Sequence, residues 1–142
     1  MFEKIVVVCT GNICRSPTVA AMLKAAAPDK QITSAGLAAL VGYEMNDVAR
    51  EVAQAHGLHC PPHQARQLDS AISSGADLLL VMDKRQRNAL MQRFPMASGK
   101  TFLLSHWNGG HDIPDPYQRD RETFEHVYTM MEQASHAWLA RL

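Results

Sequence analysis

The sequence of 142 residues has few cysteines, no long apolar run and no excess charge of either sign. Three cysteines, an odd number, do not form the disulfide framework of a small secreted domain, so a reducing cytoplasm is expected. No segment approaches the ~20 apolar residues of a membrane span, and the first residues lack the longer apolar region of a secretion signal. We therefore expect a cytoplasmic protein that does not insert into membranes.

The chain also lacks a net charge, because 14 lysines and arginines balance 14 aspartates and glutamates. A neutral chain has no general attraction to nucleic acid or to acidic membranes. With 46% hydrophobic and 20% charged residues, the composition is ordinary for a globular protein rather than a disordered one. The length suits a single domain over residues 1–142, and we expect a monomer.

Apolar patterning predicts four strands that alternate with helices. The strands are expected at 5–8, 31–34, 77–82 and 101–104, and the helices at 18–27, between 46 and 57, and at 68–74, 84–94 and 120–142. Ser16, Asn46 and Asp83 are the expected N-caps. This alternation predicts an α/β fold, a four-stranded parallel sheet with helices on both faces in a Rossmann-like three-layer arrangement. Ligands bind beyond the carboxyl ends of such strands.

The first strand runs into a loop of sequence CTGNICRSP, residues 9–17, which precedes a helix. Taken alone, Cys9 after an apolar strand is most often a small buried hydrophobe. Gly11 and Asn12, however, tolerate positive φ, which lets successive N–H groups form an anion nest at the helix N-terminus. Arg15 is suited to gripping two oxygens of a tetrahedral anion. Ser16 is placed to donate its hydroxyl to the Cys9 sulfur, and such surroundings favour a thiolate nucleophile.

This loop resembles the phosphate-binding loop of the low-molecular-weight protein tyrosine phosphatases. The Asp-Pro-Tyr run at 115–117 resembles the general-acid motif of that family, and the element order and the Ser-Ala-Gly turn at 34–36 also match. The resemblance covers essentially the whole chain. With the His-Trp pair at 106–107 and the run at 121–124, the chain is most similar to the bacterial enzymes that dephosphorylate tyrosine autokinases of polysaccharide export. The partner that this implies is a membrane tyrosine autokinase of exopolysaccharide or capsule synthesis.

The resemblance implies that Cys9 attacks phosphorus and forms a phosphocysteine, while Arg15 and the loop amides hold the phosphate oxygens. Asp115 would protonate the departing phenolate and later deprotonate the attacking water. Neither a metal nor a cofactor is needed, because the amides and Arg15 supply the positive potential. Asn12 is expected to hold the shape of the loop. The substrate-binding residues that follow are Thr10, Gly11, Asn12, Ile13, Cys14, Ser16, Leu40 and Tyr117.

Two assignments stay open, one in the loop that carries Asp112 and Asp115 and one in the loop at 9–17. Asp112 lies three residues before Asp115, and spacing alone does not decide which of them is the acid. Cys14 either fills space under the loop or, as the family resemblance suggests, forms a reversible disulfide with Cys9 that protects it from over-oxidation.

Selectivity for phosphotyrosine over the shorter phosphoserine requires a deep slot with apolar or aromatic walls. Tyr117 is expected to form one wall and Leu40 or Tyr43 another, although Tyr43 fits ordinary surface packing better. Family members that act on phosphoarginine resemble this loop but carry Thr where Ile13 stands. The apolar Ile13 therefore favours an aryl phosphate.

Four alternatives to a tyrosine phosphatase are a protein arginine phosphatase, an arsenate reductase, a metal-binding protein and an anion-binding interaction module. Arsenate reductases share the fold and loop but need two further cysteines, and residues 77–94 contain none. His56, His59, Cys60 and His63 have the right types for a metal but no standard paired spacing. Neither G-x-x-x-x-G-K-S/T nor G-x-G-x-x-G occurs, so these nucleotide-binding loops are not supported.

Overall fold

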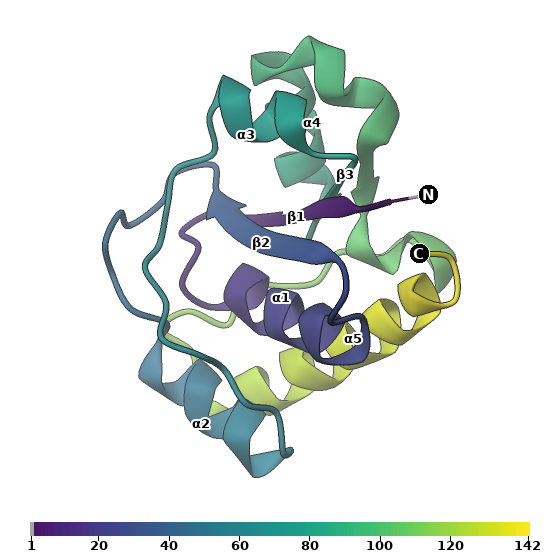
Figure 1. Cartoon of the computed structure of the whole chain (residues 1–142). Helices are drawn as coiled ribbons and strands as arrows, with labels where there is room; N and C mark the ends of the chain where they lie inside the picture. The colour runs from purple at the N-terminus through teal and green to yellow at the C-terminus, as the bar shows by residue number, and fades with distance from the viewer. Residues whose placement is uncertain (1) are drawn as a thin grey trace.

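The computed structural model describes residues 2–142, which contain one four-stranded parallel sheet (Figure 1). Its strand order is β2-β1-β3-β4, with β1 (Lys4–Cys9), β2 (Gln31–Gly36), β3 (Leu78–Val81) and β4 (Thr101–Leu103). β1 pairs with both β2 and β3, so that Cys9 lies opposite Gly36 and Val8 opposite Val81. The predicted α/β class and parallel sheet are confirmed.

Five α-helices and two 3-10 helices connect the strands within residues 2–142. They are α1 (Arg15–Ala26), α2 (Asp47–Ala55), α3 (Ser70–Gly75), α4 (Lys84–Arg93), η1 (Pro95–Lys100), η2 (Leu104–Trp107) and α5 (Arg121–Leu139). α1 and α5 cover one face of the sheet and α3 and α4 the other, while α2 packs against α1 and α5 (Figure 1). Nowhere in these residues is a helix both long and apolar enough to cross a bilayer.

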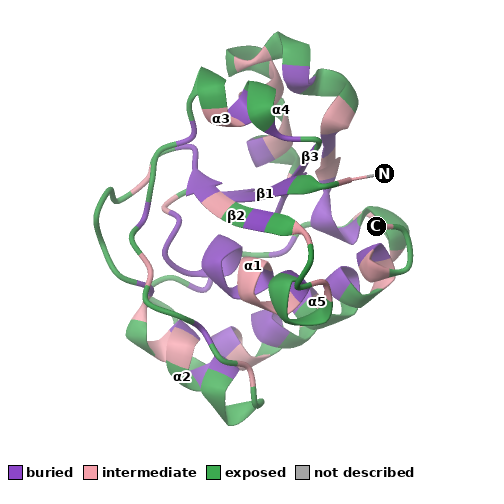
Figure 2. Ribbon diagram, in the orientation of Figure 1, coloured by how far each residue is buried: buried purple, intermediate pink, exposed green. Residues whose placement is uncertain are grey.

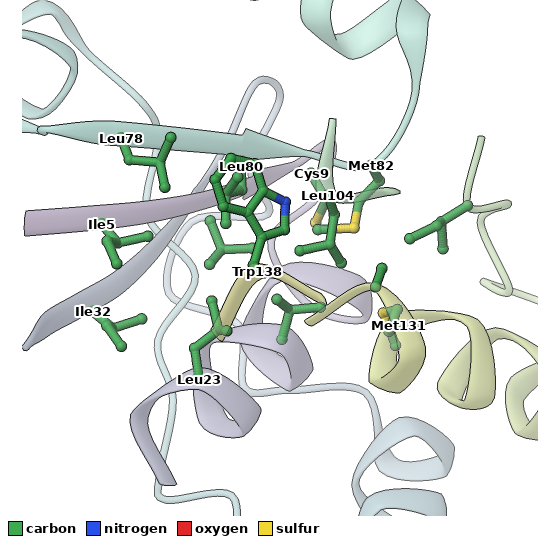
Figure 3. Packing of buried hydrophobic residues seen from close by; sticks show 14 of the residues in the cluster. Ile5, Cys9, Leu23, Ile32, Leu78, Leu80, Met82, Leu104, Met131 and Trp138 are labelled. Carbon is green, nitrogen blue, oxygen red and sulfur yellow. The ribbon is translucent and has the colours of Figure 1, made fainter. Parts of the chain in front are cut away.

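The central strands are buried on both faces (Figure 2), because alternate side chains enter two separate cores. Toward α1 and α5 point Ile5, Val7, Leu78 and Leu80; toward α3 and α4 point Val6, Val8, Leu79 and Val81. Figure 3 shows Trp138 of α5 in the first core, close to Leu80 and Leu104. This burial accounts for the apolar run at 78–82, from which the strand is predicted.

The predicted caps at Asn46 and Asp83 are confirmed, since each carboxamide or carboxylate oxygen accepts a backbone N–H of the following first turn. The prediction that Ser16 caps α1 is wrong, whereas the predicted contact of its hydroxyl with the Cys9 sulfur is present. α1 begins at Arg15, directly after Cys14, and no side chain caps it. The Ser16 hydroxyl instead lies beside the Cys9 sulfur. The first-turn N–H groups thus carry no side-chain cap, which is what an anion at a helix N-terminus requires.

Several element boundaries differ from the prediction by a few residues. β2 extends two residues past 34, because parallel pairing with β1 continues to Cys9 and Gly36. The helix expected at 68–74 begins only at Ser70, since Asp69 caps it and Leu68 donates its backbone N–H to the Gly36 carbonyl. β3 begins at Leu78 rather than 77, because the Asp77 carboxylate binds the backbone N–H groups of residues 3 and 4. The helices at 84–94 and 120–142 end at 93 and 139.

Gly36 marks a close approach between β2 and the loop after β1. A Cβ atom at this position would lie 2.5 Å from the Thr10 carbonyl oxygen and 3.1 Å from Asn12 Cβ. Only glycine leaves room for the loop to pass so near the strand.

Candidate active site

The backbone of residues 9–14 curls so that its carbonyl groups face outward. The carbonyls of residues 9, 10 and 11 accept the N–H groups of Leu37, Ala38 and Leu40 at 3.0, 2.9 and 3.1 Å. The carbonyl of residue 12 accepts His63 Nε2 at 2.7 Å, and that of residue 13 accepts Asn46 N–H at 2.8 Å. In a trans peptide the N–H points opposite to the C=O. The amides of residues 10–14 therefore converge on the inner side of the loop, as an anion nest requires.

Asn12 ties this loop together from behind. Its φ is 60°, a left-handed conformation that asparagine tolerates, and it is fully buried. The side-chain amide Nδ2 donates to Ser16 Oγ at 2.7 Å and to Ser34 Oγ at 3.0 Å, while Oδ1 accepts the Arg66 backbone N–H at 2.9 Å. This is the shape-holding role expected of Asn12.

The Cys9 sulfur lies at the centre of the loop and is nearly buried. Ser16 Oγ is 2.9 Å from it. Because Ser16 Oγ already accepts a hydrogen bond from Asn12, its only proton is available for the sulfur. A hydroxyl that donates to sulfur stabilises the thiolate, which is the nucleophilic form.

Arg15 begins α1, and its side chain is 4% exposed. Its Nη1 donates to the Ile113 carbonyl at 2.9 Å and lies 3.4 Å from Asp83 Oδ2, while Nη2 lies 3.8 Å from Asp115 Oδ2. These contacts fix the guanidinium at the mouth of the amide nest. Sequence reasoning had assigned Asp83 only as a helix cap, and its contact with the arginine was missed.

A pocket of about 210 Å3 opens over the loop. Tyr117 and Leu40 stand at its rim, each about two-fifths exposed. Tyr43 is 62% exposed and is not among the lining residues, so the second wall is Leu40. The residues that line this pocket are Cys9, Thr10, Gly11, Ile13, Cys14, Arg15, Ala38, Leu40, Asp115 and Tyr117. The structure thus gathers the predicted site residues, with only Asn12 and Ser16 placed behind the loop.

Asp115 and Asp112 occupy different surroundings. Asp115 lines the pocket with Cys9, and its side chain is 51% exposed. Asp112 instead accepts the Lys84 backbone N–H at 3.1 Å and lies 3.7 Å from Lys84 Nζ. Of the two carboxylates, only Asp115 faces the nucleophile.

Cys14 is buried under the loop and faces the same pocket as Cys9. Burial raises the pKa of the Cys14 thiol to about 12, with the Asp115 carboxylate and Cys9 adding to the shift and Arg15 opposing it. Cys14 is therefore a neutral thiol at physiological pH.

Three further residues support the loop and were missed by sequence reasoning. His63 donates from Nε2 to the Asn12 carbonyl, Arg66 donates its backbone N–H to the Asn12 side chain, and Gln86 Nε2 donates to Thr10 Oγ1 at 3.1 Å. Each lies more than 50 residues in sequence from the loop residue that it contacts, and no local pattern marks them.

The histidines of the proposed metal cluster face different partners. His56 Nε2 is 2.8 Å from Glu125 Oε2 and its ring stacks on Tyr128, whereas His63 is bonded to the Asn12 carbonyl. Across residues 2–142, no three His, Cys, Asp or Glu side chains converge as metal ligands. His56 thus contacts α5, whereas His63 supports the loop that carries Cys9.

A thiol surrounded by inward amides, a guanidinium at the nest and a carboxylate above it together define a cysteine-dependent phosphatase site. The family model described as low molecular weight phosphotyrosine protein phosphatase matches residues 4–142. The chain belongs to this family and is a protein-tyrosine-phosphatase.

Individual relatives cover the chain from end to end. The low molecular weight protein-tyrosine-phosphatase Wzb of Salmonella typhimurium is 44% identical over 142 residues, which are 100% of this chain and 95% of the relative. The structure of Vibrio vulnificus Wzb in complex with benzylphosphonate is 44% identical, with a TM-score of 0.97 and full coverage of both chains. The arginine phosphatase YwlE from Geobacillus stearothermophilus is 31% identical, with a TM-score of 0.92 and coverage of 98% and 92%.

Proposed function

We propose that this enzyme hydrolyses phosphotyrosine through a phosphocysteine intermediate, with Cys9 as nucleophile, Arg15 as phosphate ligand and Asp115 as general acid and base. The observation that carries the proposal is the arrangement around Cys9, where a hydroxyl proton faces the sulfur and five loop amides face inward. A thiolate and a phosphate dianion are both stabilised by the same donors, so the site is prepared before substrate arrives.

The first half of the reaction transfers the phosphoryl group to sulfur. The Cys9 thiolate attacks phosphorus in line, the P–O bond to tyrosine breaks, and Asp115 donates its proton to the departing phenolate. The loop amides and Arg15 hold the three equatorial oxygens, where the negative charge is spread in the transition state. The acid is needed because a phenol with a pKa near ~10 is a poor leaving group as the anion at neutral pH.

The second half regenerates the enzyme. Asp115, now ionised, takes a proton from water as the water oxygen attacks phosphorus. The S–P bond breaks, and Cys9 leaves as a thiolate stabilised by the Ser16 hydroxyl, with inorganic phosphate as product. The half-exposed position of Asp115 beside the pocket suits both proton transfers, because water reaches it there.

Selectivity for an aryl phosphate rests on the pocket walls. Ile13, Leu40 and Tyr117 line the pocket and offer apolar contact to a phenyl ring between the nest and the rim. The benzylphosphonate held by the Vibrio relative is itself an aromatic phosphonate. The Geobacillus arginine phosphatase has the same fold, so arginine phosphatase activity is the alternative that the test has to distinguish.

The proposed protein substrate is a membrane tyrosine autokinase of exopolysaccharide or capsule synthesis, acted on in the cytoplasm. Its support is the resemblance to bacterial phosphatases of polysaccharide export and the 44% identity with Wzb. A reducing compartment is required because the nucleophile has to remain a thiol. We further propose that the enzyme acts as a monomer, since all the site residues come from one chain.

Hydrolysis of p-nitrophenyl phosphate and of matched phosphotyrosine, phosphoserine and phosphoarginine peptides tests the proposal. We expect phosphotyrosine to be preferred, activity to survive chelators, and Cys9→Ser to abolish it, with Cys60→Ser as the matched control. Activity that persists in Cys9→Ser overturns the mechanism, and a preference for phosphoarginine overturns the substrate class.

A further inference from the structure

A second hollow, larger than the pocket over the catalytic loop, lies away from Cys9. Its volume is about 650 Å3, against about 210 Å3 over the catalytic loop, and the two cavities share no lining residue. It is bounded by α1, by β2 and by the segment 57–66, which runs past both elements between α2 and α3 (Figure 1). A volume of this size lies within the range of small-molecule sites, roughly 300–1,000 Å3.

The residues that line this hollow are mostly apolar, with two cations among them. α1 contributes small side chains at Pro17, Ala20, Ala21 and Ala25, which leave space above the helix. The segment 57–66 contributes further apolar side chains, Leu58, Pro61 and Pro62, together with His59 and Gln64. Lys24 and Arg66 lie at the wall, and no aspartate or glutamate is among the lining residues. The cavity therefore favours a ligand that is apolar over most of its surface and negatively charged at one end.

Among residues 2–142, neither of these two cations has an acidic partner. The Arg66 guanidinium donates to the Ser34 carbonyl at 2.9 Å and to Thr33 Oγ1 at 2.8 Å, both of them uncharged acceptors. Throughout residues 2–142, no carboxylate lies within 4.0 Å of a Lys24 or Arg66 nitrogen. An anionic group in the cavity would supply the missing countercharge.

Three lining residues are also the ones that hold Asn12. Arg66 donates its backbone N–H to Asn12 Oδ1, His63 donates to the Asn12 carbonyl, and Ser34 Oγ accepts from Asn12 Nδ2. Asn12 in turn positions Ser16, whose hydroxyl faces the Cys9 sulfur. A ligand that shifts Arg66 or Ser34 therefore acts on the nucleophile through three successive hydrogen bonds, by way of Asn12 and Ser16, without entering the catalytic pocket.

We propose that this cavity is a regulatory site for a small organic anion with an apolar body, and that its occupancy lowers the turnover of the enzyme through Arg66, Ser34 and Asn12. The ligand competes for the Arg66 donors that now bind β2, which loosens the support of Asn12. The effect is on kcat rather than on substrate binding, because the ligand and the substrate occupy separate cavities.

Anilinonaphthalene sulfonate is a suitable probe, because it has an apolar aromatic body and one negative charge and its fluorescence rises in an apolar environment. Its binding is measured by fluorescence in saturating inorganic phosphate, which occupies the catalytic loop. We expect one probe molecule per chain to bind under these conditions. Lys24→Glu is expected to weaken binding about five- to tenfold, since one attractive charge becomes repulsive at a partly exposed site. Ala25→Phe, which fills the cavity from an exposed position of α1, is expected to weaken it further.

The matched control is Lys4→Glu, which makes the same charge change at the start of β1 and is expected to leave the affinity unchanged. In p-nitrophenyl phosphate hydrolysis, saturating probe is expected to lower kcat at least twofold with KM unchanged, and this inhibition should be reduced in Lys24→Glu. Equal affinity in Lys24→Glu and Lys4→Glu, or displacement of the probe by phosphate, overturns the site. Binding without a change in kcat, or a rise in KM alone, overturns the coupling, while hydrolysis without probe reports separately on the proposed function.

Discussion

The Ser16 hydroxyl oxygen lies 2.9 Å from the Cys9 sulfur and accepts a hydrogen bond from the Asn12 side-chain amide on its other side. The amide thereby orients the hydroxyl, whose proton has only the sulfur left to bind. A single serine thus transmits the shape of the loop to the reactivity of the thiol.

Replacing Ser16 by Ala removes a hydrogen bond to a charged sulfur, a loss of about 1.5–3 kcal/mol. We expect kcat to fall by roughly 10- to 150-fold and the rate of Cys9 alkylation by iodoacetate to fall with it. Ser135→Ala is the matched control, because Ser135 is equally buried and contacts Met22 Sδ instead. An unchanged alkylation rate in Ser16→Ala would contradict the role of the hydroxyl.

The general acid is tested by comparing Asp115→Asn with Asp112→Asn. Loss of a positioned acid slows hydrolysis about 10²- to 10⁴-fold, most strongly for leaving groups of high pKa. For Asp115→Asn we therefore expect a steep dependence of kcat on the leaving-group pKa across a series of aryl phosphates. Asp112→Asn is expected to keep the shallow dependence of the parent enzyme, since Asp112 is held by Lys84. The reverse result would transfer the acid role to Asp112.

Asn12 combines a strained backbone with three side-chain hydrogen bonds, and two substitutions separate them. Asn12→Ala removes all three hydrogen bonds and places at this positive φ a residue that tolerates it poorly. We expect a loss of about 2–4 kcal/mol of unfolding free energy. Asn12→Gly removes the φ penalty only, so it should recover about 1–2 kcal/mol while kcat stays low. Urea unfolding and steady-state kinetics together check this, and full recovery of kcat in Asn12→Gly would show that the amide contributes nothing.

The disulfide between Cys9 and Cys14 remains a prediction. The raised pKa of Cys14 further predicts how fast this disulfide forms. After peroxide oxidises Cys9 to a sulfenic acid, Cys14 loses its proton and its thiolate attacks that sulfur; the S–O bond breaks, the S–S bond forms, and the leaving hydroxide takes up a proton to become water. Because Cys14 is almost wholly protonated at neutral pH, we expect slow closure that accelerates as pH rises. Recovery of activity with a thiol reductant after peroxide treatment measures the protection. Equal recovery in Cys14→Ser would remove the idea.

The buried Cys14 also makes folding stability depend on alkaline pH. Its thiol pKa is about 12 in the folded chain and about 8.5 in an unfolded one, so between these values the unfolded state binds fewer protons. Stability is therefore lost as pH rises through this window, by up to about 1.4 kcal/mol per pH unit from this group. We expect Cys14→Ala to have a flatter slope of unfolding free energy between about pH 8 and pH 10 in urea titrations. An identical slope would show that Cys60 and Tyr128, whose pKa values burial also raises, carry the dependence.

Local chemistry was sufficient to predict the strands, the caps at Asn46 and Asp83 and the loop that carries Cys9. These features depend on residues that are neighbours in sequence: an apolar run, a carboxylate before a helix, a glycine and an asparagine between a strand and a helix. The sequence predicts two uses for the Ser16 hydroxyl; the helix cap is absent, and the contact with the Cys9 sulfur, seven residues earlier, is the one that forms.

The residues that sequence reasoning missed are all brought to the loop by the closure of the fold. Asp83 reaches Arg15 because β3 lies beside β1, so that the loops following the two strands open at the same edge of the sheet. His63 and Arg66 reach Asn12 only because the segment after α2 returns past α1. A histidine after two prolines suggests a metal ligand as readily as a support for a backbone carbonyl, and only the three-dimensional arrangement separates the two.

The catalytic loop also restricts Gly36, a residue that takes no part in the chemistry. It meets neither thiol nor phosphate, yet the space that its missing side chain leaves is occupied by the Thr10 carbonyl. In a library of all single substitutions selected for phosphatase activity, position 36 would be depleted as severely as Cys9, beginning with alanine. A map of intolerant positions on this chain therefore outlines the volume reserved for the loop as well as the atoms that react.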